Sequence, residues 1–293
     1  MTTGFVVLAN ASAGSADDEA VAAVAGRLRA VGPVEVAGTG SDDEVDAVLA
    51  DLDGRVLVVA GGDGSVHTAV ARLRSLGLAG SAAVGLVPLG TGNDLARGVA
   101  VPLEPVEAAD LIASGPAARP ADLLVDDAGG VVVNAAHAGL GAEAADRSDS
   151  LKGSLGPLAY PVGALVAGVR ESGWDLEVVA DGAVVHRGTV LLVGVGNGPT
   201  IGGGTELFPG ARVDDGQADV VVVTAVGPAA RAAFGAALRT GDHLDRDDVL
   251  AVRAADVVVS GDPVRHNTDG EVGDEVVRRR YTVEPGAWRL IRP

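Results

Sequence analysis

The chain has no cysteine, a single lysine and few aromatic residues, and each shortage limits what the protein can be. Without cysteine it has neither disulfide bonds nor a thiolate zinc site. Aromatic residues make up 2% of the 293 residues and hydrophobic residues 47%, so its cores are built mainly from valine, alanine and leucine. A chain of this length is typically divided into two domains.

Positive charge is also scarce, because 22 lysine and arginine residues face 40 aspartate and glutamate residues, for a net charge of −18. Nonspecific binding of nucleic acid needs a basic surface, so we expect no nucleic-acid partner. Such acidity is typical of proteins that stay hydrated in concentrated salt, where repulsion is screened. We therefore hypothesise a salt-rich, halophilic cytoplasm. A GC-rich genome that favours arginine is the alternative, and full stability at low salt would count against the first hypothesis.

Long hydrophobic runs are missing as well. Residues 1–14 lack the basic start and the apolar core of a signal peptide. The longest uncharged run near the middle, residues 153–169, contains Pro157 and Pro161 and is short for a membrane span of about 20 residues. We expect a buried or interfacial helix over 157–169 and a cytoplasmic protein.

The first 120 residues alternate strand-like and helix-like segments, which is typical of a doubly wound α/β domain. Expected strands are 5–9, 34–37, 56–60 and 83–87, and expected helices are 17–30, 42–50, 66–76 and 93–98. After residue 120, valine-rich strands are expected at 131–136, 176–180, 183–196, 218–226, 256–261 and 278–284, with a helix at 228–239. The sequence therefore predicts an α/β domain at 1–120 and a mainly antiparallel β-sandwich domain at 121–281. Residues 282–293 are candidates for packing back on the first domain.

A first glycine-rich segment, Gly61-Gly62-Asp63-Gly64-Ser65, follows the expected strand 56–60 and precedes a helix. Glycines let backbone N–H groups approach phosphate oxygens, and a helix N-terminus adds partial positive charge. Asp63 is suited to reach a magnesium ion through water. Taken alone, an ordinary strand–turn–helix corner explains the segment equally well.

A second segment, Pro88-Leu89-Gly90-Thr91-Gly92-Asn93-Asp94-Leu95-Ala96-Arg97, follows the next strand. Thr91 suits contact with phosphate or ribose, Asn93 is the expected cap of the helix 93–98, and Asp94 adds a second acid. In open α/β sheets, ligands bind beyond the carboxyl ends of the strands. Two such loops after adjacent strands therefore favour a phosphate site over two ordinary strand–turn–helix connections.

Together the two segments resemble the catalytic domain of the diacylglycerol kinase family, which includes bacterial lipid kinases and sphingosine kinases. The resemblance continues in order through Asn10–Gly14, Arg119–Leu123, Asn134, Gly139–Gly141, Lys152 with 156–160, Asn197-Gly198, Gly202–Gly204, Asp214–Gly216 and Asp269-Gly270-Glu271. The chain departs from the family pattern at Ala11, where proline is common, and at Ser65, where threonine is usual. His67-Thr68 stands where the family frequently has Asn-Glu.

The resemblance implies an NAD-kinase-like fold and a magnesium-dependent ATP kinase that phosphorylates the hydroxyl of diacylglycerol or a related lipid alcohol. It implies an ATP site between the domains and a lipid-substrate role for the second. The residues implied around the nucleotide are Asn10, Ala11, Ser12, Ala13, Gly14, Thr39, Gly61, Gly62, Asp63, Gly64, Ser65, Val66, His67, Thr68, Gly90, Thr91, Gly92 and Asn93.

The resemblance also implies roles for the acidic residues. Asp63, Asp94 and Asp122 would position the catalytic magnesium. Glu271 would be the general base within the catalytic motif that includes Asp269, and a carboxylate close to an acceptor hydroxyl can take its proton. Residues Arg212, Asp215 and Gln217 would bind a structural magnesium, Asp215 through its side chain and the other two through backbone carbonyls. Standing alone, each Asp-Gly pair would be read as a plain turn.

Two other functions stay open. An NAD kinase has a similar glycine loop and fold but typically an Asn-Glu pair in place of this second segment. A non-catalytic nucleotide-binding module on the same scaffold would be expected to lose at least one of the four acids Asp63, Asp94, Asp122 and Glu271. The acceptor lipid is not named by any motif, and residues 155–169 are a candidate lining for its cleft. We expect transient contact with a membrane surface, while the oligomeric state stays open between a monomer and the homodimer that family members often form.

Overall fold

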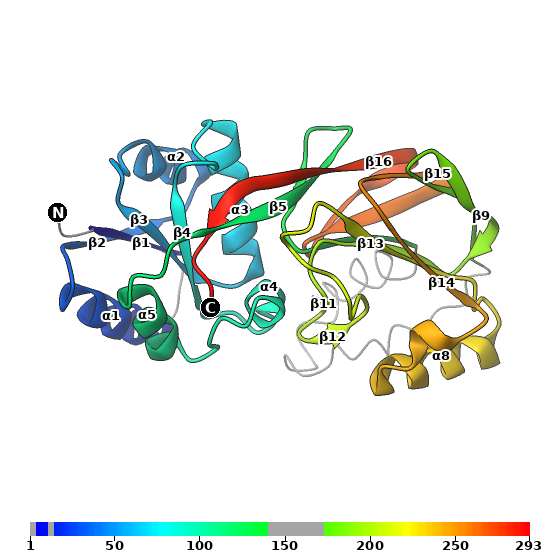
Figure 1. Ribbon diagram of the computed structural model, residues 1–293, viewed down its shortest axis with the longest axis horizontal. Coiled ribbons are helices and arrows are strands. Elements are labelled where there is room, and N and C mark those ends of the chain that lie inside the picture. Colours follow the sequence, from blue (N-terminus) through cyan, green and yellow to red (C-terminus); the bar gives the residue numbers. More distant parts are fainter. Residues whose placement is uncertain (1–3, 11–14, 140–172) are drawn as a thin grey trace. The chain divides into compact units, whose positions relative to one another are not determined.

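The structure, a computed structural model, describes residues 4–10, 15–139 and 173–293, and in it the chain forms two compact units. Unit 1 comprises Met1–Leu123 and Pro285–Pro293, and unit 2 comprises Leu124–Glu284. The chain passes between them within two strands, β5 (Arg119–Asp126) and β16 (Glu271–Leu290) (Figure 1). The boundaries that the sequence suggests, after residues 120 and 281, each lie three residues earlier.

Unit 1 is a parallel sheet with helices on both faces. Its strands run in the order β2-β1-β3-β4, and the end of β16 adds a further parallel strand beside β4 through Arg289 and Leu290. Helices α1 and α5 cover one face and α2 and α3 the other (Figure 1). The elements are β1 (Phe5–Asn10), α1 (Ser15–Arg29), β2 (Val34–Thr39), α2 (Asp42–Ala50), β3 (Val56–Gly61), α3 (Asp63–Ser75), β4 (Ala83–Pro88), α4 (Asp94–Gly98) and α5 (Pro105–Ala113). The expected doubly wound α/β fold is confirmed.

The parallel sheet of unit 1 follows from its strand sequences. Residues 56–60 of β3 are all buried, as expected for a strand covered on both faces. The neighbouring helix α2 begins at the expected residue, because Ser41 accepts a hydrogen bond from the N–H of Glu44. The Glu44 carboxylate reaches back to the N–H of Gly40 at 2.7 Å and fixes the turn into this helix.

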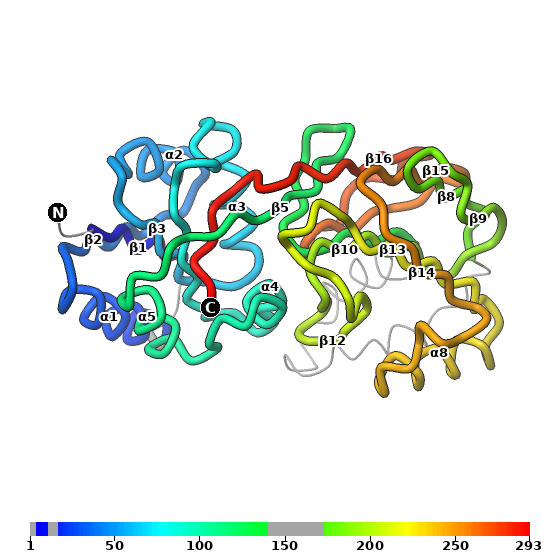
Figure 2. Tube along the Cα trace, in the orientation of Figure 1, coloured from blue at the N-terminus to red at the C-terminus, as the bar shows by residue number. Residues whose placement is uncertain are grey.

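Unit 2 is mainly antiparallel, with strand order β14-β13-β10-β7-β15-β16, and with β8 paired to β15 and β9 paired to β8. Its remaining elements are β6 (Val131–Val132), β7 (Ala135–Gly139), β8 (Trp174–Ala180), β9 (Ala183–Val190), β10 (Leu192–Gly196), β11 (Thr200–Ile201), β12 (Thr205–Glu206), β13 (Ala218–Val223), α8 (Pro228–Thr240), the 3₁₀ helix η1 (His243–Asp245), β14 (Val249–Ala254) and β15 (Asp256–Thr268). The trace in Figure 2 follows these strands through unit 2. The β-sandwich that the sequence predicts is confirmed, although the single expected run 183–196 is two strands, β9 and β10.

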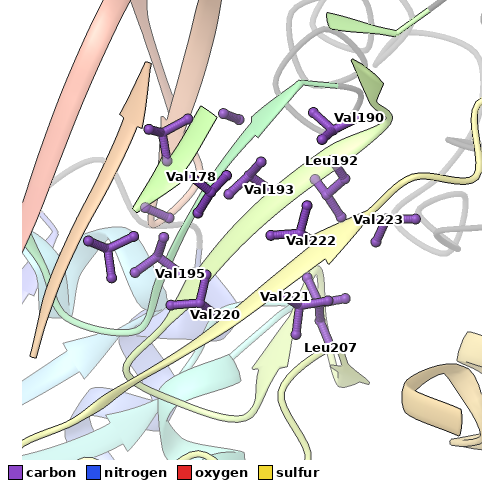
Figure 3. Packing of buried hydrophobic residues seen from close by; sticks show 14 of the residues in the cluster. Val178, Val190, Leu192, Val193, Val195, Leu207, Val220, Val221, Val222 and Val223 are labelled. Atoms are coloured by element: carbon purple, nitrogen blue, oxygen red, sulfur yellow. The ribbon is translucent and has the colours of Figure 1, made fainter. Parts of the chain in front are cut away.

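Valine dominates the core of unit 2, as the shortage of aromatic residues requires. Figure 3 shows side chains from β10 and β13, among them Val193, Val195 and Val220, packed together. Glycines in β10 leave room for a rare aromatic ring, because a Cβ on Gly196 would lie 2.4 Å from the ring of Phe208. Small residues on a strand thus create the hollow that the ring fills.

No helix in residues 4–10, 15–139 and 173–293 is long and apolar enough to cross a membrane. The helix expected over 157–169 and the candidate lipid-cleft lining at 155–169 lie outside the described residues, as do Ala11, Ser12, Ala13, Gly14 and Lys152.

A buried histidine gives unit 2 a pH-sensitive element. His266 of β15 is 5% exposed, and its Nδ1 lies 2.8 Å from the hydroxyl of Tyr281. Burial, and next the charge of Arg279, lower the pKa of His266 from 6.5 to about 4. At neutral pH this imidazole is uncharged and acts as part of the core.

The unfolding free energy should therefore fall as the pH is lowered from about 6.5 towards about 4. In that window the unfolded chain binds a proton at His266 that the folded chain does not. His266→Asn keeps an oxygen acceptor for Tyr281 and removes the titration. Urea unfolding at pH 7 and pH 5 should show a loss of stability smaller by about 1–2 kcal/mol in the variant than in the wild type. Equal losses would contradict the assignment.

Candidate functional site

The two glycine loops of unit 1 meet at one edge of its sheet. Strands β3 and β4 are parallel neighbours, and the N–H of Leu89 donates to the carbonyl of Gly61 at 3.0 Å. Gly62 and Gly90 then face each other backbone to backbone, since a Cβ on Gly90 would lie 2.6 Å from the Cα of Gly62. The loops can lie this close only because both residues are glycine.

Asp63 lies at the start of a helix rather than in a loop. Helix α3 begins at Asp63 with Gly62 as its N-cap, three residues before the expected start at Val66. The Oδ1 atom of Asp63 accepts a hydrogen bond from the backbone N–H of Leu95 at 3.3 Å, in the first turn of α4. The first loop therefore presents the N–H groups of a helix N-terminus, and its acid is tied to the second loop.

The second loop is closed by its own side chains. Asn93 has a left-handed backbone with φ 52° and occupies the N-cap position of α4, but its side chain makes no cap. Instead its Oδ1 accepts from the N–H of Gly90 at 3.1 Å and its Nδ2 donates to the carbonyl of Gly90 at 2.7 Å. The expectation that this side chain caps the helix with its carbonyl oxygen is thus wrong. Arg97 adds a bond from Nε to the carbonyl of Gly92 at 2.9 Å.

A small cavity of about 10 Å³ lies between the two loops. It is lined by Gly61, Gly62, Asp63, Val66, Leu86, Pro88, Asn93, Leu95 and Ala96. This space suits a single water molecule. A phosphate group is too large for this space and would have to bind outside the contact of the loops.

Other predicted nucleotide residues lie at the same edge of the sheet. Asn10 and Thr39 are the last residues of β1 and β2 and are partners in the parallel register. The carboxyl ends of β1 to β4 thus carry Asn10, Thr39, Gly61 and Pro88 side by side. Ser65, His67 and Thr68 are partly buried on α3, with Val66 buried beneath them.

Asp122 anchors the returning C-terminal segment of unit 1. It lies in β5, is 2% exposed, and its Oδ1 accepts from the N–H of Gly286 at 2.7 Å. The indole N–H of Trp288 donates to the backbone carbonyl of Asp122 at 3.2 Å. The sequence made residues 282–293 candidates for packing on the first domain, and Pro285–Pro293 lie in unit 1, but the contacts of Gly286 and Trp288 with Asp122 had no sequence signal.

The acids of unit 1 suit a magnesium ion that is bound by few carboxylates and completed by water and phosphate. Within the described part of the chain, no group of three or more acidic or histidine side chains is arranged to hold a metal ion. Magnesium in phosphoryl-transfer sites typically binds through one or two carboxylates, with water and phosphate completing its shell. Asp63 and Asp94 suit that mode, because the hydrogen bond to Leu95 holds Asp63 next to the start of α4.

In unit 2, Asp269-Gly270 forms the two-residue turn between β15 and β16. Both residues have positive φ, 49° and 99°, the pattern of a type I′ turn that favours Asp-Gly. Thr268 and Glu271 face each other across the turn, and Glu271 is exposed at the first residue of β16. The Asp269 carboxylate accepts backbone N–H bonds from Val133, Asn134 and Ala135.

The loop predicted to bind a structural magnesium is occupied by an arginine. Asp215 Oδ1 accepts from the N–H of Gln217 at 3.1 Å, and its Oδ2 is bound by the guanidinium of Arg253 from β14. The Nε of Arg253 also lies 3.6 Å from Asp219, while Arg212 pairs with Asp214 at 3.1 Å. Both oxygens of Asp215 thus accept hydrogen bonds from protein donors, so a magnesium ion at this loop would compete with Arg253 for the carboxylate.

Arg253 gave no signal in the sequence. It becomes a partner of this loop only because it faces Asp219 in the antiparallel register of β13 and β14.

Two family models together match most of the chain. Residues 4–125 match the diacylglycerol kinase catalytic domain, and residues 134–292 match the YegS C-terminal NAD kinase beta sandwich-like domain. A Xanthomonas campestris protein named "Probable lipid kinase YegS-like" is 35% identical, over 94% of this chain and 92% of that protein. A Pseudomonas aeruginosa protein of the same name is 33% identical, over 99% of this chain and 94% of its own length.

Solved structures share the fold. A diacylglycerol kinase from Bacillus anthracis has a TM-score of 0.80 at 22% identity, covering all of this chain and 97% of that one. An NAD kinase from Archaeoglobus fulgidus in complex with ATP has a TM-score of 0.54 at 12% identity, covering 98% and 92%. At these identities the two structures show similarity of fold alone.

The contact between the glycine loops yields a test. Gly90→Ala should push the loops apart and lower the unfolding free energy by about 1–3 kcal/mol, because its Cβ would meet the Cα of Gly62. Gly80→Ala is the matched control, since a Cβ there meets nothing within 4 Å. Urea unfolding of both variants measures the difference. Equal stability of the two would show that the loops do not pack as described.

A second test concerns Arg253. If its guanidinium takes the place of a cation at Asp215, millimolar MgCl₂ should leave the melting temperature of the wild type unchanged relative to EDTA. Arg253→Gln should make the melting temperature rise by several degrees with MgCl₂, because an ion bound only to the folded state stabilises it. Arg187→Gln, which removes the exposed ion pair with Glu177, is the control. A magnesium-dependent rise in the wild type as large as in Arg253→Gln would overturn the idea.

Proposed function

The chain belongs to the YegS-like lipid kinases, which carry a diacylglycerol kinase catalytic domain, and we propose that it transfers the γ-phosphate of ATP to the hydroxyl of a lipid alcohol. The observation that carries this proposal is the contact of Gly62 with Gly90, which gathers two loops and Asp63 at one sheet edge. Phosphoryl transfer depends mainly on positioned phosphates and on neutralised charge. A rigid pair of glycine loops is suited to that task.

In the proposed reaction, the loops of unit 1 bind the triphosphate. The N–H groups of the helix N-terminus at the start of α3 would donate to phosphate oxygens, with Asn10, Thr39 and Thr91 nearby at the same edge. Asp63 and Asp94 would hold magnesium partly through water, and the bound ion would supply neutralisation of the phosphate charge. The carboxylate of Asp122, engaged by Gly286, would act more remotely by fixing the C-terminal segment.

Glu271 is the proposed general base. Its side chain is exposed at the first residue of β16, directly after the turn, where it is accessible to an acceptor hydroxyl. A carboxylate that takes the proton of the attacking hydroxyl contributes typically 10²–10⁴-fold to such a reaction.

We propose diacylglycerol or a related lipid alcohol as the acceptor. The relatives are named for lipids without a specific acceptor, and the Bacillus anthracis protein is named for diacylglycerol. An ether-linked glycerolipid, a sphingoid base and a polyprenol are the other members of this class. Because such substrates lie in membranes, we propose that the protein works at a membrane surface in the cytoplasm. Either a monomer or a homodimer could do so.

A transfer assay tests the proposal. Wild type, Glu271→Gln and the control Glu275→Gln, also exposed on β16, are incubated with γ-labelled ATP and MgCl₂ at low and high KCl. Acceptors are diacylglycerol, an ether lipid, a sphingoid base and a polyprenol in mixed micelles, with NAD as a separate arm. We expect label on a lipid, a loss of at least about 100-fold in Glu271→Gln, and little change in the control.

Other results would overturn parts of the proposal. Label on NAD alone would identify an NAD kinase, and ATP binding without transfer to any acceptor would indicate a non-catalytic module. Full turnover of Glu271→Gln would remove this residue from the role of base.

A further inference from the structure

A single carboxylate in unit 2 binds three consecutive backbone N–H groups. Asp269 Oδ2 accepts from Val133 at 2.7 Å, and its Oδ1 accepts from Asn134 and Ala135, each at 2.9 Å. The backbone N–H of Asp269 donates in turn to the carbonyl of Ala135 at 3.0 Å. Both carboxylate oxygens are thus used to join the β15–β16 turn to a segment more than 130 positions earlier in the chain.

The segment that Asp269 binds is itself held from a second side. Asn197 donates from Nδ2 to the carbonyl of Val133 at 2.7 Å and from its backbone N–H to the carbonyl of Asn134 at 2.8 Å. Gly198 must be glycine here, because a Cβ would lie 2.2 Å from Oδ1 of Asn134. The three N–H groups that bind Asp269 therefore belong to a backbone segment that Asn197 also holds in place through hydrogen bonds.

This anchor fixes the place of Glu271. Only Gly270 separates the two acids, and the N–H of Gly270 is bound by Oδ1 of Asn267 at 3.0 Å. Without the anchor, Glu271 would lie next to the free tip of a hairpin, where backbone hydrogen bonds are exposed and open easily. Small displacements of a reacting group can lower rates by a factor of about 100.

We infer that Asp269 is a positioning residue that acts through Glu271 and takes no part in proton transfer. The inference rests on the proposed role of Glu271. It gives Asp269 a specific role within the catalytic motif, because its oxygens already accept the N–H groups of residues 133–135. The proposed substrate class is unchanged. Glu271 takes the proton, and Asp269 positions Glu271.

The chain contains a matched control in the turn between β8 and β9. Asp181-Gly182 is also a two-residue turn with positive φ at both residues, 47° and 80°. The Oδ1 of Asp181 accepts from the N–H groups of Ala255 and Asp256 at 3.0 and 2.9 Å, and its own N–H donates to the carbonyl of Asp256. Asp181 is thus the same kind of anchor, on a turn that carries no proposed reacting group.

Three variants, Asp269→Asn, Asp269→Ala and Asp181→Asn, separate the roles. An asparagine oxygen can still accept two of the three N–H bonds, so Asp269→Asn should lower kcat about 10-fold and Asp269→Ala about 100-fold, with KM for ATP within about 3-fold. The pH–rate profile should keep its shape in Asp269→Asn. Asp181→Asn keeps an oxygen that can accept both of its N–H bonds, and it should keep the kcat of the wild type.

A double-variant cycle tests the route through Glu271. In a Glu271→Gln background, Asp269→Asn should change kcat by less than about 3-fold, because the group that it positions is gone. If Asp269 transferred a proton itself, Asn and Ala would be equally inactive and the pH profile would lose a limb. If its role were only structural, Asp269→Asn would match Asp181→Asn in kcat. Either result overturns the inference.

Amide hydrogen exchange gives a readout that does not depend on catalysis. Exchange at residues 133–135 should quicken in Asp269→Asn and stay unchanged in Glu271→Gln. If Glu271→Gln keeps full turnover while Asp269→Asn still quickens this exchange, the proposed base fails and the anchor stands. If exchange is unaffected by Asp269→Asn, the anchor itself is refuted.

Discussion

Where Gly62 and Gly90 meet, two backbones lie within van der Waals contact, and the arrangement of the candidate phosphate site depends on that approach. The parallel pairing of β3 and β4 brings both loops to the same sheet edge, but side chains would keep them apart. Because neither glycine has a Cβ, α3 can begin directly at Asp63, and the carboxylate of Asp63 can reach the N–H of Leu95. The lack of a side chain at these two positions thus determines where Asp63 and the N-terminus of α3 lie.

Carboxylates have an unexpected task in this acidic chain, which is to bind backbone N–H groups at turns. Asp126 binds the N–H groups of Ala128 and Gly130, Asp262 binds that of Asp175, and Asp181 and Asp269 anchor their hairpins. Each such bond satisfies a backbone N–H donor in a turn or near the end of a strand. Part of the excess of acid is therefore explained by local structure rather than by hydration of the surface in salt.

The sequence predicted elements whose signals are local. The apolar run of β3 and the Ser41 cap of α2 are examples, since buried strands and helix starts are encoded in neighbouring residues. Helix α5 was missed, although Pro105 at its first turn is a helix-start signal. Strands β15 and β16 are longer than expected, because Gly261, Pro263 and Gly273 interrupt the apolar pattern without ending the pairing.

For the candidate site too, the sequence predicted only what local motifs encode. Local motifs identified the loops that contain Gly62 and Gly90 and the turn that contains Asp269. The contacts of those motifs could not be found locally, because they depend on long-range register. Asp269 reaches residues 133–135 and Arg253 reaches Asp215 only once distant strands are aligned.

Charge at the proposed phosphate site constrains how the reaction can work. The single lysine of the chain is at position 152, and Arg97, within the second loop, donates from Nε to the carbonyl of Gly92. A helix N-terminus offers about half a positive charge, far less than a triphosphate needs. If ATP binds at these loops, the remaining neutralisation would fall to a cation, and the magnesium proposed near Asp63 and Asp94 would supply it. The shortage of lysine and the two acids at the loops would then be parts of one arrangement, in which a metal supplies the positive charge that lysine does not.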